Sequence, residues 1–213
     1  ILDELILEQV RGGADTVVNL AAGLDTRPYR LDLPADLNWI EVDLPGITQF
    51  KEERLASYQP ACRLTRERVD LSDPARREQF FSDLESSAHR AVVITEGLLY
   101  YLSENDVIAL SDRLMSHPRV QTWLMDLVDS RLFGRLAQAS DALAEDDVRF
   151  RFLPNAAYFE NLGWKTEAFR TFQAQGEALK RPPPAALVEN NPEYAEGAKH
   201  TGILQLAPKT RLF

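Results

Sequence analysis

Acidic side chains follow four short apolar segments, each at the point where we expect a β-strand to end. These residues are Asp25, Asp43, Asp70 and Glu96. In open parallel sheets, ligands bind outside the carboxyl ends of the strands, so the four acids are expected to meet at one edge. Carboxylates placed there can accept hydrogens from ribose hydroxyls and from an adenine amino group, which favours an adenosine ligand. Taken alone, each acid could instead cap the helix that follows its strand.

Contacts to adenosine can be assigned to three residues. Asp43 follows the second expected strand, where a carboxylate can accept hydrogen bonds from both ribose hydroxyls. Asp70 is followed by Leu71. We therefore expect Asp70 to accept from the adenine amino group while Leu71 packs against the ring.

The loop after the first expected strand distinguishes two classes of cofactor. A dinucleotide site needs G-x-G-x-x-G, so that the pyrophosphate can approach the backbone and a helix N-terminus. This chain has Ala21, Gly23 and Thr26 at those positions, and Asp25 would add negative charge beside a phosphate. A ligand without phosphates fits better. S-adenosylmethionine has that character, and we expect the loop from Ala21 to Asp25 to contact its methionine part.

Charged side chains near this loop suit the ends of such a ligand. Asp25 and Glu96 are compatible with a neighbouring sulfonium or ammonium group. Arg27 can bind the ligand carboxylate, and Arg30 is a second candidate for that contact. The alternative for both arginines is an exposed position at a helix start.

Apolar runs of four to six residues alternate with longer amphipathic stretches, which predicts strand-helix-strand units and a mainly parallel sheet. The two last segments can pair as an antiparallel unit. The expected strands cover residues 16–22, 38–42, 62–69, 91–95, 122–128, 164–169 and 201–207. Arginines in the third segment indicate an edge strand, and the apolar fourth segment indicates a central one.

Helix starts are predicted at two capping sequences and one proline. Asp73 precedes Pro74, and Ser103 precedes Asp106 by three residues, as in N-terminal caps. A further helix is expected after Pro45, with Ile47, Phe50 and Leu55 on one face.

Composition limits the classes of function. The chain of 213 residues has 33 acidic and 24 basic side chains, a net charge of -9, and we find no basic patch for a nucleic acid. A single cysteine, Cys62, excludes an internal disulfide and favours a cytoplasmic protein. No apolar run is long enough for a membrane span. We expect a single domain over residues 1–213, with no metal ligand set and no predicted oligomeric state.

Four segments of the sequence resemble the motifs of the leucine carboxyl methyltransferase family, and especially its bacterial branch of S-adenosylmethionine-dependent and polyketide O-methyltransferases. They occur in the family's order. The segments are NLAAGLDTRPYRL at 19–31, WIEVDLP at 39–45, VDLSD at 69–73 and ITEGLLYYL at 94–102.

This resemblance implies a Rossmann-like class I methyltransferase fold, with a seven-stranded mixed α/β sheet and helices on both faces. It places Ala21 and Gly23 at the methionine moiety, Asp43 at the ribose, Asp70 at the adenine and Glu96 near the methionine end. Family members carry glycine at the position of Ala21. They also have an N-terminal helical segment over the site, which we expect to lie outside this chain.

The resemblance implies an O-methyltransferase whose acceptor is a small-molecule carboxyl or hydroxyl group. A carboxylate acceptor needs no general base, whereas a hydroxyl needs one, and no catalytic residue is predicted. Tyr101 is a candidate substrate contact, with packing as the alternative. Asp126 and Asp129 follow the core of the fifth strand and are candidates to reach the cleft, with helix capping as the alternative for Asp129. The alternative functions are S-adenosylmethionine binding without turnover and a nicotinamide-dependent oxidoreductase.

Overall fold

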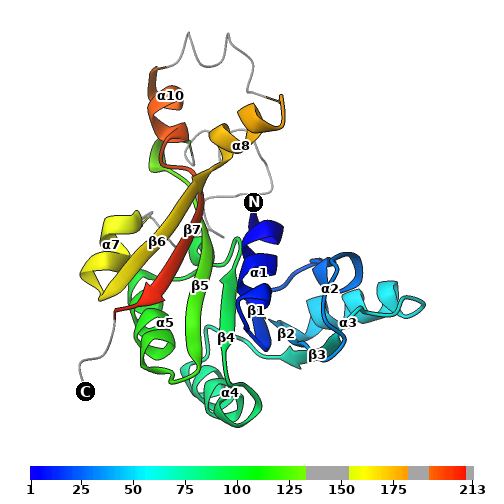
Figure 1. Ribbon diagram of the computed structural model, residues 1–213. Helices are drawn as coiled ribbons and strands as arrows, with labels where there is room; N and C mark the ends of the chain where they lie inside the picture. The colour runs from blue at the N-terminus through cyan, green and yellow to red at the C-terminus, as the bar shows by residue number, and fades with distance from the viewer. Residues whose placement is uncertain (133–153, 182–191, 210–213) are drawn as a thin grey trace.

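A seven-stranded sheet forms the centre of the computed structural model, which describes residues 1–132, 154–181 and 192–209 (Figure 1). The strand order is β3-β2-β1-β4-β5-β7-β6, and β7 pairs antiparallel with both of its neighbours, β5 and β6, whereas β1 to β5 pair parallel. The strands are β1 Thr16–Leu20, β2 Asn38–Asp43, β3 Arg63–Arg68, β4 Ala91–Thr95, β5 Val120–Leu127, β6 Trp164–Thr171 and β7 Gly202–Pro208. The predicted mixed sheet, its edge strand and its antiparallel end are therefore confirmed.

Helices cover both faces of this sheet. Leu5 and Ile6 of α1 pack on the face that includes Val17, whereas Phe81 and Leu110 pack on the face that includes the next residue, Val18. The helices are α1 Leu2–Arg11, α2 Arg27–Arg30, α3 Pro45–Leu55, α4 Pro74–Ser87, η1 Leu99–Tyr101, α5 Glu104–Ser116, α7 Ala156–Asn161, α8 Phe172–Ala178 and α10 Pro192–Ala198. Figure 1 shows α8 and α10 beyond the sheet, where β6 ends and β7 begins.

Parallel pairing aligns the carboxyl ends of the strands that precede the predicted site. Leu20 at the end of β1 is paired with Val42 on β2 and with Thr95 on β4. Asp43 is in turn paired with Arg68 at the end of β3. The loops after these four strands consequently begin at one edge of the sheet.

The predicted helix caps are present. Asp73 accepts the backbone N–H groups of Ala75 and Arg76 at 2.9 and 3.2 Å. Ser103 accepts the N–H of Asp106 at 3.2 Å and donates its hydroxyl to the Asp106 carboxylate at 2.6 Å. These bonds satisfy N–H groups that a helix start leaves without partners.

The buried face of α3 is polar. Ile47 lies 41% exposed, whereas Thr48 and Lys51 are each 3% exposed. The reason is Glu41 on β2, which is also 3% exposed, because a buried carboxylate requires a nearby cation. Lys51 Nζ lies 2.8 Å from Glu41 Oε1 as an ion pair without hydrogen-bond geometry. The apolar side of α3 therefore faces outward.

Arg66 on β3 completes this buried charge cluster. Its Nε donates to Glu41 Oε2 at 2.9 Å, and its Nη2 donates to the hydroxyl of Tyr29 in α2 at 2.7 Å. The cluster thereby connects α2, α3 and the two strands at this edge of the sheet.

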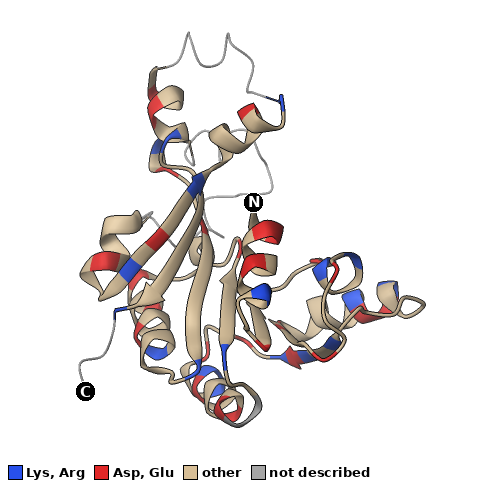
Figure 2. Cartoon of the chain, viewed as in Figure 1, with Lys and Arg blue, Asp and Glu red and all other residues tan. Residues whose placement is uncertain are grey.

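Charged side chains of both signs are spread over the outer surfaces, while the central strands are almost free of them (Figure 2). Among the described residues, the structure has no helix with the length and apolarity that crossing a bilayer requires.

The Glu41 cluster gives a stability prediction. Lys51→Met removes one of the two cations beside a buried carboxylate, so we expect a loss of about 3 kcal/mol in the free energy of unfolding. Urea titration measures this loss. Glu52→Gln is the matched control, because Glu52 binds Arg68 at the surface, and it should cost less than about 1 kcal/mol. Equal effects of the two changes would contradict a buried role for Lys51.

Candidate functional site

An open groove of about 630 Å³ runs along the carboxyl ends of β1 to β4. A smaller hollow of about 320 Å³ adjoins it and shares Ala21, Gly23 and Glu96 with it. The groove also contains Asp43, Asp70, Leu71 and Tyr101, and the hollow also contains Asp25 and Arg27. The structure therefore brings these predicted site residues to one edge of the sheet, and the candidate Arg30 lies in neither lining.

Asp43 joins the first two loops of the groove. Its Oδ2 accepts the backbone N–H of Gly23 at 2.6 Å, and its Oδ1 accepts the N–H of Leu44 at 2.7 Å. Gly23 has φ +48°, and a Cβ built on it would meet no atom within 4 Å. The glycine thus leaves open space beside the groove while its amide fixes the carboxylate.

Asn19, which the sequence did not single out, positions the acid of the smaller hollow. Its Nδ2 donates to Asp25 Oδ2 at 2.8 Å from a buried place on β1. The other oxygen of Asp25 accepts the backbone N–H of Arg27 at 2.8 Å. A polar residue in an otherwise apolar strand was the available signal, because a buried amide needs hydrogen-bond partners.

The guanidinium of Arg27 lies among three carboxylates. It donates to Asp25 and Glu96 through Nη1 at 2.9 Å each, and to Asp3 of α1 through Nε at 2.7 Å. Burial alone would lower the pKa of Arg27, but these carboxylates outweigh it and raise the pKa. The predicted contact of Arg27 with a ligand carboxylate stays a prediction. Arg30 binds Asp3 and is absent from the linings of both hollows.

Apolar side chains line the groove beside Asp70. Leu44 is 48% exposed and Ile47 is 41% exposed, whereas Leu71 is buried. Asp70 Oδ1 accepts both the backbone N–H and the hydroxyl of Ser72, at 2.9 and 2.6 Å. The exposure of two large apolar residues at the start of a helix is costly in water, and a flat apolar ligand would cover them.

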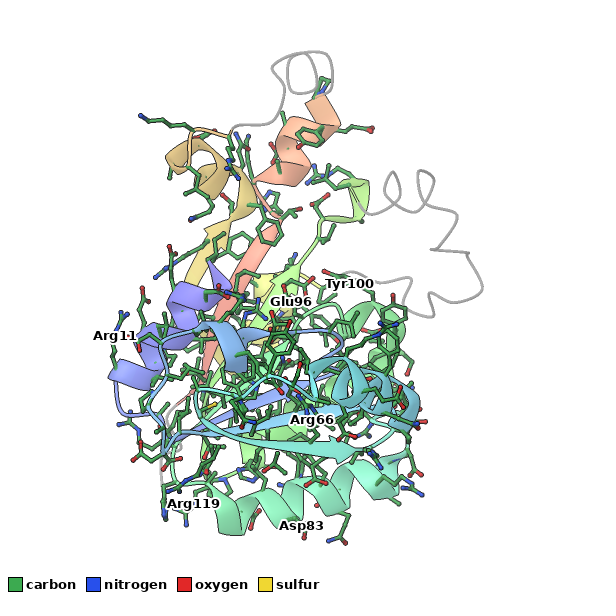
Figure 3. The ribbon with its side chains drawn as sticks, turned by 90° about the vertical axis from the view of Figure 1, so that its right-hand side faces the viewer. Arg11, Arg66, Asp83, Glu96, Tyr100 and Arg119 are labelled. Atoms are coloured by element: carbon green, nitrogen blue, oxygen red, sulfur yellow. The ribbon has the colours of Figure 1, made fainter. Side chains whose placement is uncertain are left out.

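The loop after β4 forms the opposite wall. It begins at Glu96, continues through Gly97 at φ +72° and includes Tyr101, which is 51% exposed. Figure 3 shows Glu96 and Tyr100 close together at this edge of the sheet. Burial and the neighbouring carboxylate of Asp126 raise the pKa of Tyr100 far above its ordinary value, so its phenol stays protonated.

Two further features bear on the chemistry. Within the ranges that the structure describes, no group of three or more His, Cys, Asp or Glu side chains is arranged to hold a metal ion. A separate hollow of about 440 Å³ lies between β3 and α4, with Thr65, Phe80 and Asp83 in its lining. It shares Val69 with the strand-end groove and contains none of the predicted site residues.

Comparison with known sequences identifies a family. The model of the family "Leucine carboxyl methyltransferase" matches residues 1–115. A Mycobacterium bovis protein named "Putative S-adenosyl-L-methionine-dependent methyltransferase" is 31% identical over 211 residues, which are 91% of this chain and 68% of the relative. A protein of the same name from Mycolicibacterium paratuberculosis is 38% identical over 117 residues, 53% of this chain. That match spans 42% of the relative's own length.

Solved structures show the same fold at low sequence identity. A DUF574 family protein from Streptomyces avermitilis superposes with a TM-score of 0.64 at 15% identity, covering 98% of this chain and 81% of that one. The methyltransferase domain of bacterial CtHen1-C superposes with a TM-score of 0.60 at 13% identity, covering 98% and 97%. The class I methyltransferase fold predicted from the sequence is confirmed.

The backbone of Ala21 gives a second stability prediction. Ala21 has φ +56°, a left-handed conformation that is strained for a residue with a Cβ. Ala21→Gly should therefore raise the free energy of unfolding by about 0.5 to 1 kcal/mol, after the greater chain entropy of glycine is subtracted. Ala22→Gly is the control, because Ala22 is buried without a positive φ, and this change should destabilise the protein. Thermal unfolding measures both variants. If both substitutions change the stability in the same direction, the backbone strain assigned to Ala21 would be refuted.

Proposed function

Because this chain belongs to the leucine carboxyl methyltransferase family, we propose that it is an S-adenosylmethionine-dependent O-methyltransferase acting on a carboxyl or hydroxyl group of a small molecule. The observation that carries the proposal is the convergence of Asp43, Asp70 and Glu96 on one groove with an apolar wall. This groove therefore combines carboxylates that can accept hydrogen bonds from an adenosine with an apolar surface on which its ring can pack.

The ribose part of the cofactor suits Asp43. Both of its oxygens already accept a backbone N–H group. A carboxylate oxygen has two lone pairs, so each can accept a second hydrogen from a ribose hydroxyl. Because the backbone bonds fix the carboxylate in advance, little side-chain entropy remains to be lost on binding.

The adenine part suits the wall formed by Leu44, Ile47 and Leu71, with Asp70 at its rim. A purine ring that covers the two exposed side chains would gain about 25 cal/mol for each Å² of apolar surface removed from water. Asp70 would supply the polar contact that distinguishes an amino group from a carbonyl on the ring.

The methionine part suits the smaller hollow. Asp25 and Glu96 lie on either side of Arg27 Nη1, and Asp3 adds a third carboxylate to the same guanidinium. Arg30 also pairs with Asp3, so three carboxylates are set against two arginines, and the one acid in excess favours a cation at this end. The open space beside Gly23 leaves room for the ligand, and a sulfonium with an ammonium group fits the charge.

When bound, S-adenosylmethionine supplies an electrophilic methyl group on a positively charged sulfur. The chain's own residues then act by holding the donor in a fixed orientation, because methyl transfer depends on alignment with the acceptor. Tyr101 stands half-exposed in the groove as the candidate acceptor contact. A substrate that accepts the methyl group on a carboxylate would need no general base from the protein.

Two other functions fit parts of the site less well. A nicotinamide-dependent oxidoreductase would place a pyrophosphate at the loop after β1, where Asp25 adds a carboxylate beside Glu96. Binding of S-adenosylmethionine without turnover would use the same groove and is motivated by Ala21. Transfer of a labelled methyl group to small carboxylic acids or phenols separates the enzyme from the binding protein.

Calorimetry with S-adenosylmethionine and S-adenosylhomocysteine tests the cofactor site. Asp43→Ala removes the ribose acceptor and the partner of the Gly23 amide, so we expect the affinity to fall at least tenfold, or about 1.4 kcal/mol. Asp36→Ala is the matched control, because Asp36 is an exposed carboxylate just before β2 begins, at the end of the strand away from the groove. This variant should bind both ligands as tightly as the wild-type protein does. A folded wild-type protein that gives no heat with either ligand would contradict the proposed function.

A further inference from the structure

Asp126, near the end of β5, accepts two hydrogen bonds from the loop that follows β4. Its Oδ1 accepts the backbone N–H of Gly97 at 2.8 Å, and its Oδ2 accepts the hydroxyl of Tyr100 at 2.8 Å. The two donors lie at the start of this loop and in η1. One carboxylate therefore holds the loop at two points from a neighbouring strand.

The loop held in this way is a wall of the cofactor groove. Glu96, Gly97, Leu98, Tyr101 and Leu102 all line the groove. Each of these residues lies within two positions of Gly97 or Tyr100 in the sequence. Asp126 itself is absent from the linings of the groove and the smaller hollow, so any effect on a ligand has to pass through the loop.

The turn at Gly97 also controls the direction of Glu96. Gly97 has φ +72°, a left-handed conformation, and a Cβ built there would meet no atom within 4 Å. The bond from the N–H of Gly97 to Asp126 ties this turn to the neighbouring strand. Glu96 precedes this turn and accepts Arg27 Nη1 at 2.9 Å. If this turn were loosened, the carboxylate of Glu96, which lines both the groove and the smaller hollow, would move.

We propose that Asp126 is a positioning residue for the cofactor site, which acts through the Gly97 amide and the Tyr100 hydroxyl to hold Glu96 and Tyr101 in the groove. This inference rests on the proposed function and adds a residue to it. Burial raises the pKa of Asp126, while the two hydrogen bonds oppose that effect. A part-buried carboxylate is costly to keep charged, and fixing the groove wall through two loop donors is a use for it.

The test measures the affinity for S-adenosylmethionine by calorimetry in four variants, well below their unfolding temperatures. Asp126→Ala removes both acceptors, so we expect the dissociation constant to rise about tenfold. Asp126→Asn retains a carbonyl oxygen that can accept from the Gly97 amide, and Tyr100→Phe leaves the bond between Gly97 and Asp126 intact. The dissociation constants of these two variants should therefore stay within about threefold of the wild-type value. Asp112→Ala, which removes an exposed acid on α5, is the control and should match wild type.

Two results would overturn the proposal. Wild-type affinity in folded Asp126→Ala would show that the two bonds stabilise the fold without shaping the site. An equal loss in Asp126→Asn would show that the charge, rather than the acceptor geometry, matters. If Asp126→Ala does not fold, Gly97→Ala strains the same turn and should weaken binding, and unchanged affinity there would overturn the proposal. Absent binding by wild type would instead overturn the proposed function, and this inference with it.

Discussion

The hydrogen bonds from Asp43 to the amides of Gly23 and Leu44 join the loops that follow β1 and β2. The groove depends on this link, because it fixes one glycine loop and one helix start against each other before any ligand arrives. Parallel pairing provides the framework, since it ends β1, β2, β3 and β4 at the same edge. The acid is thus both a structural tie and a candidate ligand contact.

Buried charge is the second organising feature. Glu41 is held by Lys51 and Arg66 beneath α3, and Arg27 is held by Asp3, Asp25 and Glu96 beside the groove. The two clusters carry net charges of opposite sign, with cations in excess around Glu41 and carboxylates in excess around Arg27. The excess of acid lies where a cationic cofactor is expected, and the excess of cations lies under the helix.

Local sequence patterns predicted the strands, the helix caps and the edge where the acids meet. The strands and caps depend on periodicity or on residues within three positions of one another, and the edge follows because parallel strands end on the same side of the sheet. The polar buried face of α3 was not predicted, because it depends on Glu41, which comes from a strand and pairs with Lys51. Asn19, Leu44 and the two bonds of Asp126 were missed for the same reason. Their roles arise from contacts between segments distant in sequence, which a single sequence does not reveal.

The central claim is that the edge formed by the ends of β1 to β4 holds the methyl donor. Titration of isotope-labelled protein with S-adenosylhomocysteine, followed through its backbone amide NMR signals, tests this most directly. The account predicts saturable shifts concentrated at Gly23, Leu44, Leu71 and Gly97, with little change along α4. Shifts centred on the separate hollow around Phe80 and Asp83, or no saturable shift in a folded protein, would contradict it.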